Sequence, residues 1–290
     1  MRGRTMTVRV AFTSDNHFDV NRVDPQAMMT AQAEYLLQQH VQWYLIAGDL
    51  FNDFQRSQQF VVDLQAKLSY QTQVLWIAGN HDMVHGVSFD ELEKGHFNGY
   101  LHNQFVDIPN TDWRIIGNNG WYDYQFASQL DKPAADFEQW KRGFWIDRAI
   151  EQPMTDQERA DLALQQTAVQ LQAAQAANKH VIFMTHFVPR TDYIHYSTTH
   201  PFWNMANALL GTPRMGDLLN QYQVDHVLFG HTHLHPAPLK IENTTYYDQA
   251  VGYGLKRINE WQEPTFMAEW RRDTFLLDLE EKTKKLSKKG

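Results

Sequence analysis

The sequence of 290 residues contains no cysteine. It therefore cannot form disulfides, cysteine-ligated zinc fingers or iron–sulfur clusters, and it offers no thiol nucleophile. It also lacks any apolar run that approaches the ~18 residues of a membrane-spanning helix. These absences predict a soluble, cytoplasmic protein with no membrane partner.

Positive charge is also scarce: 26 lysines and arginines stand against 34 aspartates and glutamates, a formal net charge of −8. This balance argues against a broad surface that neutralises phosphates, so nucleic acid is not the expected partner, although a local basic groove stays open. The 43% of hydrophobic residues suffices for a sizeable core in a chain of this length. We expect one domain over residues 1–280 and a flexible, lysine-rich tail over 281–290.

Apolar runs bounded by turn residues alternate with amphipathic stretches, which predicts an α/β fold. The expected strands cover residues 8–13, 43–47, 74–78, 180–185 and 225–229, and the expected helices cover 25–39, 57–68 and 215–222. Towards the end of the chain, residues 239–242, 246–248 and 275–279 have the pattern of hairpin strands. The fold is therefore expected to begin and end in sheet.

Residues 121–175 depart from this alternation. Aromatic side chains crowd the first part of the segment, and a long helix rich in glutamine and alanine follows. We interpret the segment as a helical insertion over one edge of the sheet, where it would act as a lid. The alternative, an ordinary helical layer that covers a sheet face, stays open.

Five short polar blocks follow predicted strands, and each begins where its strand ends. They are Asp15-Asn16-His17, Gly48-Asp49, Gly79-Asn80-His81-Asp82, Thr185-His186 and Gly230-His231-Thr232-His233. Ligands of open α/β sheets bind beyond the carboxyl ends of the strands, so we expect these five blocks to converge at one edge.

The side chains in these blocks are suited to metal ions. Nitrogen and oxygen ligands without sulfur suit Mn²⁺, Fe, Zn²⁺ or Ni²⁺ better than Ca²⁺. Asp15 and His17 alternate along an extended chain and so are expected to face the same side, and His231 and His233 have the same spacing. A lone carboxylate such as that of Asp49 can bridge two ions. The glycines of the blocks would let the backbone approach the ions closely.

Taken together and in this order, the blocks read D-x-H, G-D, G-N-H-D, H and G-H-x-H. This series resembles the calcineurin-like metallophosphoesterases across residues 15–233. The resemblance implies a four-layer α/β/β/α sandwich with two metal ions at its edge. It implies that one ion is held by Asp15, His17 and His233, that the other is held by Asn80, His186 and His231, and that Asp49 bridges the two.

The resemblance also implies the chemistry. A hydroxide shared by two ions would attack phosphorus in line, and His81 would protonate the leaving group as general acid. Ligand identity alone does not choose the metals, and among Mn, Fe, Zn and Ni we favour Mn.

The second block departs from the protein-phosphatase pattern of this superfamily. Asn52 stands where those enzymes have an aspartate, and their phosphate-binding arginine is absent, so a phosphoprotein is not the expected substrate. Asn52 can still hold His81 through a hydrogen bond. Arg190 is a candidate phosphate contact, while His195 and His200 are either substrate contacts or surface residues of a loop.

These observations predict a metal-dependent phosphoesterase that acts on a phosphodiester or a small phosphorylated molecule, with nucleotides among the candidates. Two alternatives stay open. One is a nuclease of the same superfamily, since the stretch from Ala47 to Phe51 is similar to the corresponding segment of double-strand-break repair nucleases. The other is a scaffold that keeps the fold without catalysis. The physiological substrate and the oligomeric state do not follow from the sequence.

Overall fold

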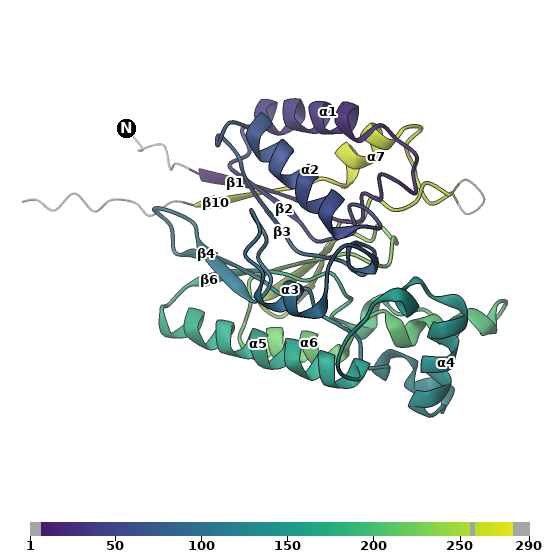
Figure 1. Ribbon diagram of the computed structural model, residues 1–290. Helices are drawn as coiled ribbons and strands as arrows, with labels where there is room; N and C mark the ends of the chain where they lie inside the picture. The colour runs from purple at the N-terminus through teal and green to yellow at the C-terminus, as the bar shows by residue number, and fades with distance from the viewer. Residues whose placement is uncertain (1–6, 256–258, 281–290) are drawn as a thin grey trace, which may run out of the picture.

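Two β-sheets lie face to face in the computed structural model, and helices cover both outer faces (Figure 1). The structure describes residues 7–255 and 259–280, so the predicted lysine-rich tail lies outside the described residues. This arrangement is the predicted four-layer α/β/β/α sandwich.

The first sheet has the strand order β10-β1-β2-β3. Its strands are β1 (Thr7–Thr13), β2 (Trp43–Ile46), β3 (Gln73–Trp76) and β10 (Phe275–Glu280). The first three run parallel, whereas β10 pairs antiparallel with β1. The outer face of this sheet is covered by α1 (Pro25–Gln38), α2 (Phe54–Lys67) and α7 (Phe266–Asp273) (Figure 1).

The second sheet has the order β4-β5-β6-β7-β9-β8. Its strands are β4 (Gln104–Asp107), β5 (Trp113–Gly117), β6 (His180–Met184), β7 (His226–Phe229), β8 (Leu239–Ile241) and β9 (Thr244–Asp248). The four central strands are parallel and the two edge strands are antiparallel to their neighbours. Helices α5 (Asp156–Ala176) and α6 (Pro213–Gln221) cover its outer face (Figure 1).

The apolar core between the sheets follows from the two-residue period of the strands. In β1, Val8, Val10 and Phe12 point between the sheets, whereas Ala11 faces the helices. Ile182 and Met184 of β6 meet them from the opposite sheet. Because the central strands β2, β3, β6 and β7 are buried on both faces, they are almost continuously apolar.

Local signals explain where the first helices begin. The Asp24 side chain caps α1 by accepting a hydrogen bond from the backbone N–H of Gln26, and Pro25 occupies the first turn. The Asp53 side chain caps α2 by accepting from the N–H of Arg56. Helix α2 therefore begins three residues before the start predicted from the apolar period.

The segment 121–175 divides into two parts. Its C-terminal part is α5, whose Leu171 and Ala174 pack with Val181 and Phe183 of β6, so this part is the ordinary helical layer of a sheet face. The remaining elements are the 3₁₀ helices η2 (Gln125–Leu130) and η3 (Ile146–Ala149) and the helix α4 (Ala134–Phe144). Figure 1 shows α4 beyond the end of the sandwich rather than on a sheet face.

The C-terminal strands differ from the hairpin expectation in one respect. Strands β8 and β9 do form a hairpin, but β10 pairs with β1 at the other end of the sequence.

Among the described residues, no helix is both long enough and apolar enough to span a membrane. The short 3₁₀ elements and α3 make up the remaining helical turns: η1 (Asp82–Val84), α3 (Phe89–Lys94), η4 (Thr191–Tyr193) and η5 (Pro201–Leu209).

Candidate metal centre and active site

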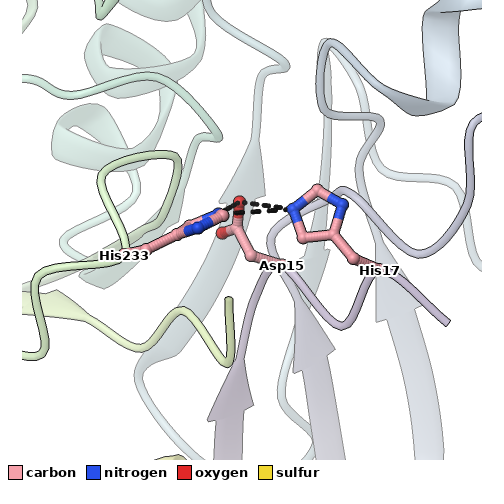
Figure 2. A group of neighbouring side chains, drawn as sticks. All are labelled: Asp15, His17 and His233. Carbon is pink, nitrogen blue, oxygen red and sulfur yellow. Dashed lines mark hydrogen bonds and ion pairs between the residues drawn. The ribbon is translucent and has the colours of Figure 1, made fainter. Parts of the chain in front are cut away.

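Side chains from the loops after β1 and β7 form the first of two groups at the common edge of the sheets. The Oδ1 atom of Asp15 lies 3.1 Å from Nε2 of His233 and 3.5 Å from Nε2 of His17. The two histidine Nε2 atoms are 3.3 Å apart. Figure 2 shows all three side chains pointing to one spot, so the group could hold a metal ion.

The second group is formed by the loops after β3, β6 and β7. The Nε2 atom of His186 lies 3.0 Å from Oδ1 of Asn80 and 3.1 Å from Nδ1 of His231. Asp49 stands between the groups, with its Oδ2 atom 3.3 Å from Nε2 of His186 and 3.7 Å from Nε2 of His17. The structure thus brings all seven predicted ligand residues together in the two sets that the resemblance implied.

The backbone that presents these side chains is unusual. Five of the seven residues have positive φ angles: Asp15, His17, Asp49, His231 and His233. Such conformations cost non-glycine residues of order 1 kcal/mol or more, and they cluster at functional sites. The predicted extended geometry of Asp15-Asn16-His17 is therefore wrong. The two side chains converge because the chain turns sharply at both residues.

Two glycines are required because the carboxylates of predicted ligands lie close to their backbone. A Cβ atom at Gly79 would overlap the carboxylate of Asp49, and one at Gly230 would overlap the carboxylate of Asp15. Both sites thus need a residue without a side chain, for the steric reason anticipated from the sequence.

The charges of the cluster suit a cation. Burial opposes ionisation of Asp49, but His186 and the other nearby histidines outweigh it and hold the pKa of Asp49 below its usual value. Burial likewise opposes charge on His186, yet the Asp49 carboxylate raises its pKa to about 9. In the described part of the chain, no lysine or arginine forms an ion pair with Asp15 or Asp49. Two buried carboxylates among imidazoles are a donor set that fits divalent metal ions.

Two acidic residues support the cluster from behind. Glu260 accepts a hydrogen bond from Nδ1 of His233 at 2.9 Å, which leaves Nε2 free to face Asp15. Asp82 accepts from the backbone N–H groups of Asp49, at 2.6 Å, and of Gly79, at 2.9 Å. Burial, with repulsion from Asp49, raises the pKa of Asp82 to about 7.

His81 lies beside the cluster. Its Nδ1 donates to Oδ1 of Asn52 at 2.6 Å, which is the contact anticipated from the sequence. Its Nε2 lies 2.9 Å from the hydroxyl oxygen of Tyr253, whose ring also packs against His17 and His233. Burial is the main cause that lowers the pKa of His81 to about 4.

A cavity of about 470 Å³ opens over these residues. Its floor includes Asp49, Asn80, His81, His231 and His233. Its walls combine apolar and polar side chains and include Trp145, Ile146, Leu210, Leu234, Tyr193, Asn207 and Tyr253.

Of the three residues predicted as substrate contacts, only one lines the cavity. His195 lines the cavity, whereas His200 bonds within its own loop to Thr199 and Ser197. Arg190 does not line the cavity: its guanidinium pairs with Asp192 at 2.8 Å and lies over the ring of Tyr246. The prediction that Arg190 contacts phosphate is not supported, because the chain after β6 directs this side chain towards α6.

The sequence reasoning missed Tyr253 and Glu260. Both follow β9, whose carboxyl end reaches the same edge as β7, its parallel neighbour. The stretch Gly252-Tyr253-Gly254, which begins four residues after the predicted strand 246–248, was a usable signal, since the polar blocks after strands identified the other five segments.

Comparison with known proteins decides the family. A family model described as calcineurin-like phosphoesterase matches residues 8–235. The chain belongs to this family. Calcineurin-like phosphoesterases hydrolyse phosphoric esters and typically depend on divalent metal ions, which agrees with the clustered histidine and aspartate side chains of this member.

Solved structures share the fold of this calcineurin-like phosphoesterase. A phosphopantetheinyl hydrolase from Mycobacterium tuberculosis superposes with a TM-score of 0.64 and 16% sequence identity, over 95% of this chain and 96% of that one. The protein TT1561 of Thermus thermophilus gives a TM-score of 0.51 and 10% identity, over 95% and 99% of the two chains. No curated protein matches the chain by sequence.

Proposed function

We propose that the protein hydrolyses a phosphodiester or a small phosphorylated molecule with two divalent metal ions, for which Mn²⁺ is favoured. The observation that carries this proposal is the gathering of seven donor residues in two sets that share Asp49. One set is Asp15, His17 and His233, and the other is Asn80, His186 and His231. When bound, the ions would supply a nucleophile derived from water and neutralise charge on the phosphoryl oxygens.

In this proposal the imidazolium form of His81, which is protonated at both ring nitrogens, gives its Nε2 proton to the oxygen of the leaving group. Burial lowers the pKa of this ring to about 4, so the charged form requires the nearby negative charge of the phosphate. Its Nε2 atom faces the cavity, because Asn52 binds the opposite ring nitrogen. The Tyr253 hydroxyl contacts Nε2 in the structure, and a leaving-group oxygen would take that position. Protonation matters because an alkoxide leaves poorly, and a positioned acid contributes about 10²–10⁴-fold to such steps.

The cavity supports a small organic substrate. Its volume of about 470 Å³ suits a ligand of modest size. Trp145, Ile146 and Leu210 offer apolar contacts, while Asn207 and Tyr193 offer hydrogen bonds. The phosphopantetheinyl hydrolase that shares the fold is named for hydrolysis of a group with this mixed character, so a phosphodiester of a flexible, partly polar alcohol is the substrate class that we favour.

The nuclease alternative has less support. The net charge is −8, and no lysine or arginine lines the cavity among residues 7–255 and 259–280. Binding of a nucleic-acid backbone depends on neutralising phosphates with such residues. We therefore favour a small substrate over a nucleic acid.

Hydrolysis of bis(p-nitrophenyl) phosphate, measured beside p-nitrophenyl phosphate, tests this proposal. The protein is stripped with chelator and refilled with Mn²⁺, and the Asp49→Ala variant serves as the blank. Turnover that depends on Mn²⁺ and favours the diester supports the proposal. Metal bound without turnover of phosphopantetheine esters or either nitrophenyl ester contradicts it and revives the scaffold alternative.

A further inference from the structure

A buried carboxylate from the helical segment contacts the predicted ligand Asn80. Asp147 belongs to η3, and the residue is only 2% exposed. Its Oδ1 atom accepts a hydrogen bond from Nδ2 of Asn80 at 2.7 Å. The two residues are 67 positions apart in the sequence, so the contact depends on where η3 is placed.

This hydrogen bond determines which atom of the Asn80 amide faces the metal centre. An ionised carboxylate only accepts hydrogen bonds, so it holds the NH₂ group of the amide and repels its oxygen. The amide oxygen then points the other way, to within 3.0 Å of Nε2 of His186. Only the oxygen can act as a ligand, and Asp147 keeps it turned towards the second group.

Packing alone does not explain why the carboxylate of Asp147 is buried. Its second oxygen, Oδ2, is also buried, and the buried hydroxyl of Tyr122 interacts with the same carboxylate. Burying a carboxylate costs stability, and such groups in native structures call for a functional explanation. The hydrogen bond to Asn80 provides that explanation.

The same short element also bounds the cavity. Ile146 of η3 and the preceding Trp145 are wall residues, and the Trp145 ring lies 6.4 Å from the ring of His231. Helix η3 also contacts η1, which begins directly after His81. One side of the segment therefore faces the substrate space while Asp147 holds a ligand of the metal centre.

We propose that Asp147 is a positioning residue for Asn80, through which the segment of residues 125–149 sets the affinity of the second metal ion. This inference rests on the proposed two-metal function, since it takes Asn80 as a ligand. It assigns the segment a role in building the metal centre in addition to enclosing the cavity.

The test is a Mn²⁺ titration of chelator-stripped protein, followed by calorimetry and by the EPR signal of free Mn²⁺. We expect the wild-type protein to bind two ions. The Asp147→Ala variant should bind one ion with the affinity of the wild type and the other ion about 10–100-fold more weakly. A loss of this size is typical when a metal-binding side chain loses the group that hydrogen-bonds to it. Asp147→Asn should restore most of this affinity, because its amide oxygen can accept the same hydrogen bond.

A matched control separates this role from general loosening of the segment. Asp123 is also buried and lies in the same region, but it accepts from Thr212 rather than from a predicted ligand. Asp123→Ala should therefore keep both affinities. The inference is overturned if Asp147→Ala binds both ions normally, if Asp123→Ala weakens the second ion equally, or if the wild type binds fewer than two ions.

Failure of the proposed function would look different. A wild-type protein that binds two Mn²⁺ ions but hydrolyses no phosphoester contradicts the function. The affinity difference between Asp147→Ala and Asp147→Asn would still support the positioning role. Melting of each metal-free variant, followed by circular dichroism, verifies that the compared proteins are folded.

Discussion

Two buried clusters of histidine and carboxylate side chains differ in how their charge is balanced, although His233 of one and His235 of the other are only two residues apart. The metal centre contains Asp15 and Asp49 among histidines. The second cluster contains His235, Glu269 and Asp273, and its donor atoms also lie close enough together to hold an ion. In the second cluster, however, Arg272 pairs with Glu269 at 3.1 Å and with Asp273 at 2.6 Å.

The other contacts of the second cluster also hold its carboxylates with groups of the protein itself. The second oxygen of Glu269 accepts from the backbone N–H groups of Gln262 and Glu263, so the cluster fastens a loop onto α7. His235 lies 3.2 Å from the carboxylate of Asp273. The comparison shows that residue types alone do not define a metal site. What distinguishes the two clusters is whether the protein supplies its own cation.

The largest expected effect comes from removing the shared carboxylate of the metal centre. Asp49→Ala should lower turnover of bis(p-nitrophenyl) phosphate by on the order of 1,000-fold or more, because both ions lose a ligand. The metal content of the purified protein, measured by mass spectrometry, should fall as well. A variant that retains two ions would show that Asp49 does not bridge.

His81 tests which residues belong to the metal centre. It lies beside the seven predicted ligands but is proposed as an acid rather than as a ligand. His81→Ala should keep the metal content and slow turnover by about 100-fold or more, most strongly for esters with poor leaving groups. Asn52→Ala should have a smaller effect in the same direction. If His81→Ala empties the site, the division between ligand and acid is wrong.

Arg272 tests the second cluster. Arg272→Met leaves two buried carboxylates without their cation, which should cost about 2 kcal/mol of folding free energy, given that the arginine side chain is 29% exposed. Urea unfolding in the presence of chelator measures this loss, and without chelator the variant is expected to take up a further metal ion at His235, Glu269 and Asp273. Arg271→Met on the same helix is the matched control. A third metal ion bound by the wild-type protein would contradict the view that Arg272 takes the place of a metal ion in the second cluster.

The smallest effect is expected at Arg190, whose charge is already balanced by Asp192 outside the cavity. Arg190→Ala should change kcat/KM by less than about 3-fold, since the pair is partly exposed and such pairs contribute little. Steady-state kinetics with bis(p-nitrophenyl) phosphate decides the point. A loss of 100-fold would return Arg190 to the role of phosphate contact.

The local sequence was sufficient to predict which polar side chains after β1, β2, β3, β6 and β7 converge at the sheet edge, although it missed Tyr253 after β9. Each of these five strands is followed by a recognisable polar block, and parallel strands place such blocks at one edge. The same reasoning did not extend to Glu260 and Asp147, which reach the site from a loop and from a 3₁₀ helix. No period or motif marks these residues, because their role depends on neighbours that are distant in the sequence.

The sequence by itself determined the family, most of the strands and helices of the sandwich, and the polar residues that converge at its edge, because these depend on short-range patterns of polarity and on motifs within a few residues. Tertiary structure alone decided that β10 pairs with β1, that Arg190 pairs with Asp192, and that Arg272 pairs with the two carboxylates of the second cluster. Strand pairing and charge pairing are contacts across long stretches of chain. Several partners satisfy the same local pattern, and only packing selects among them.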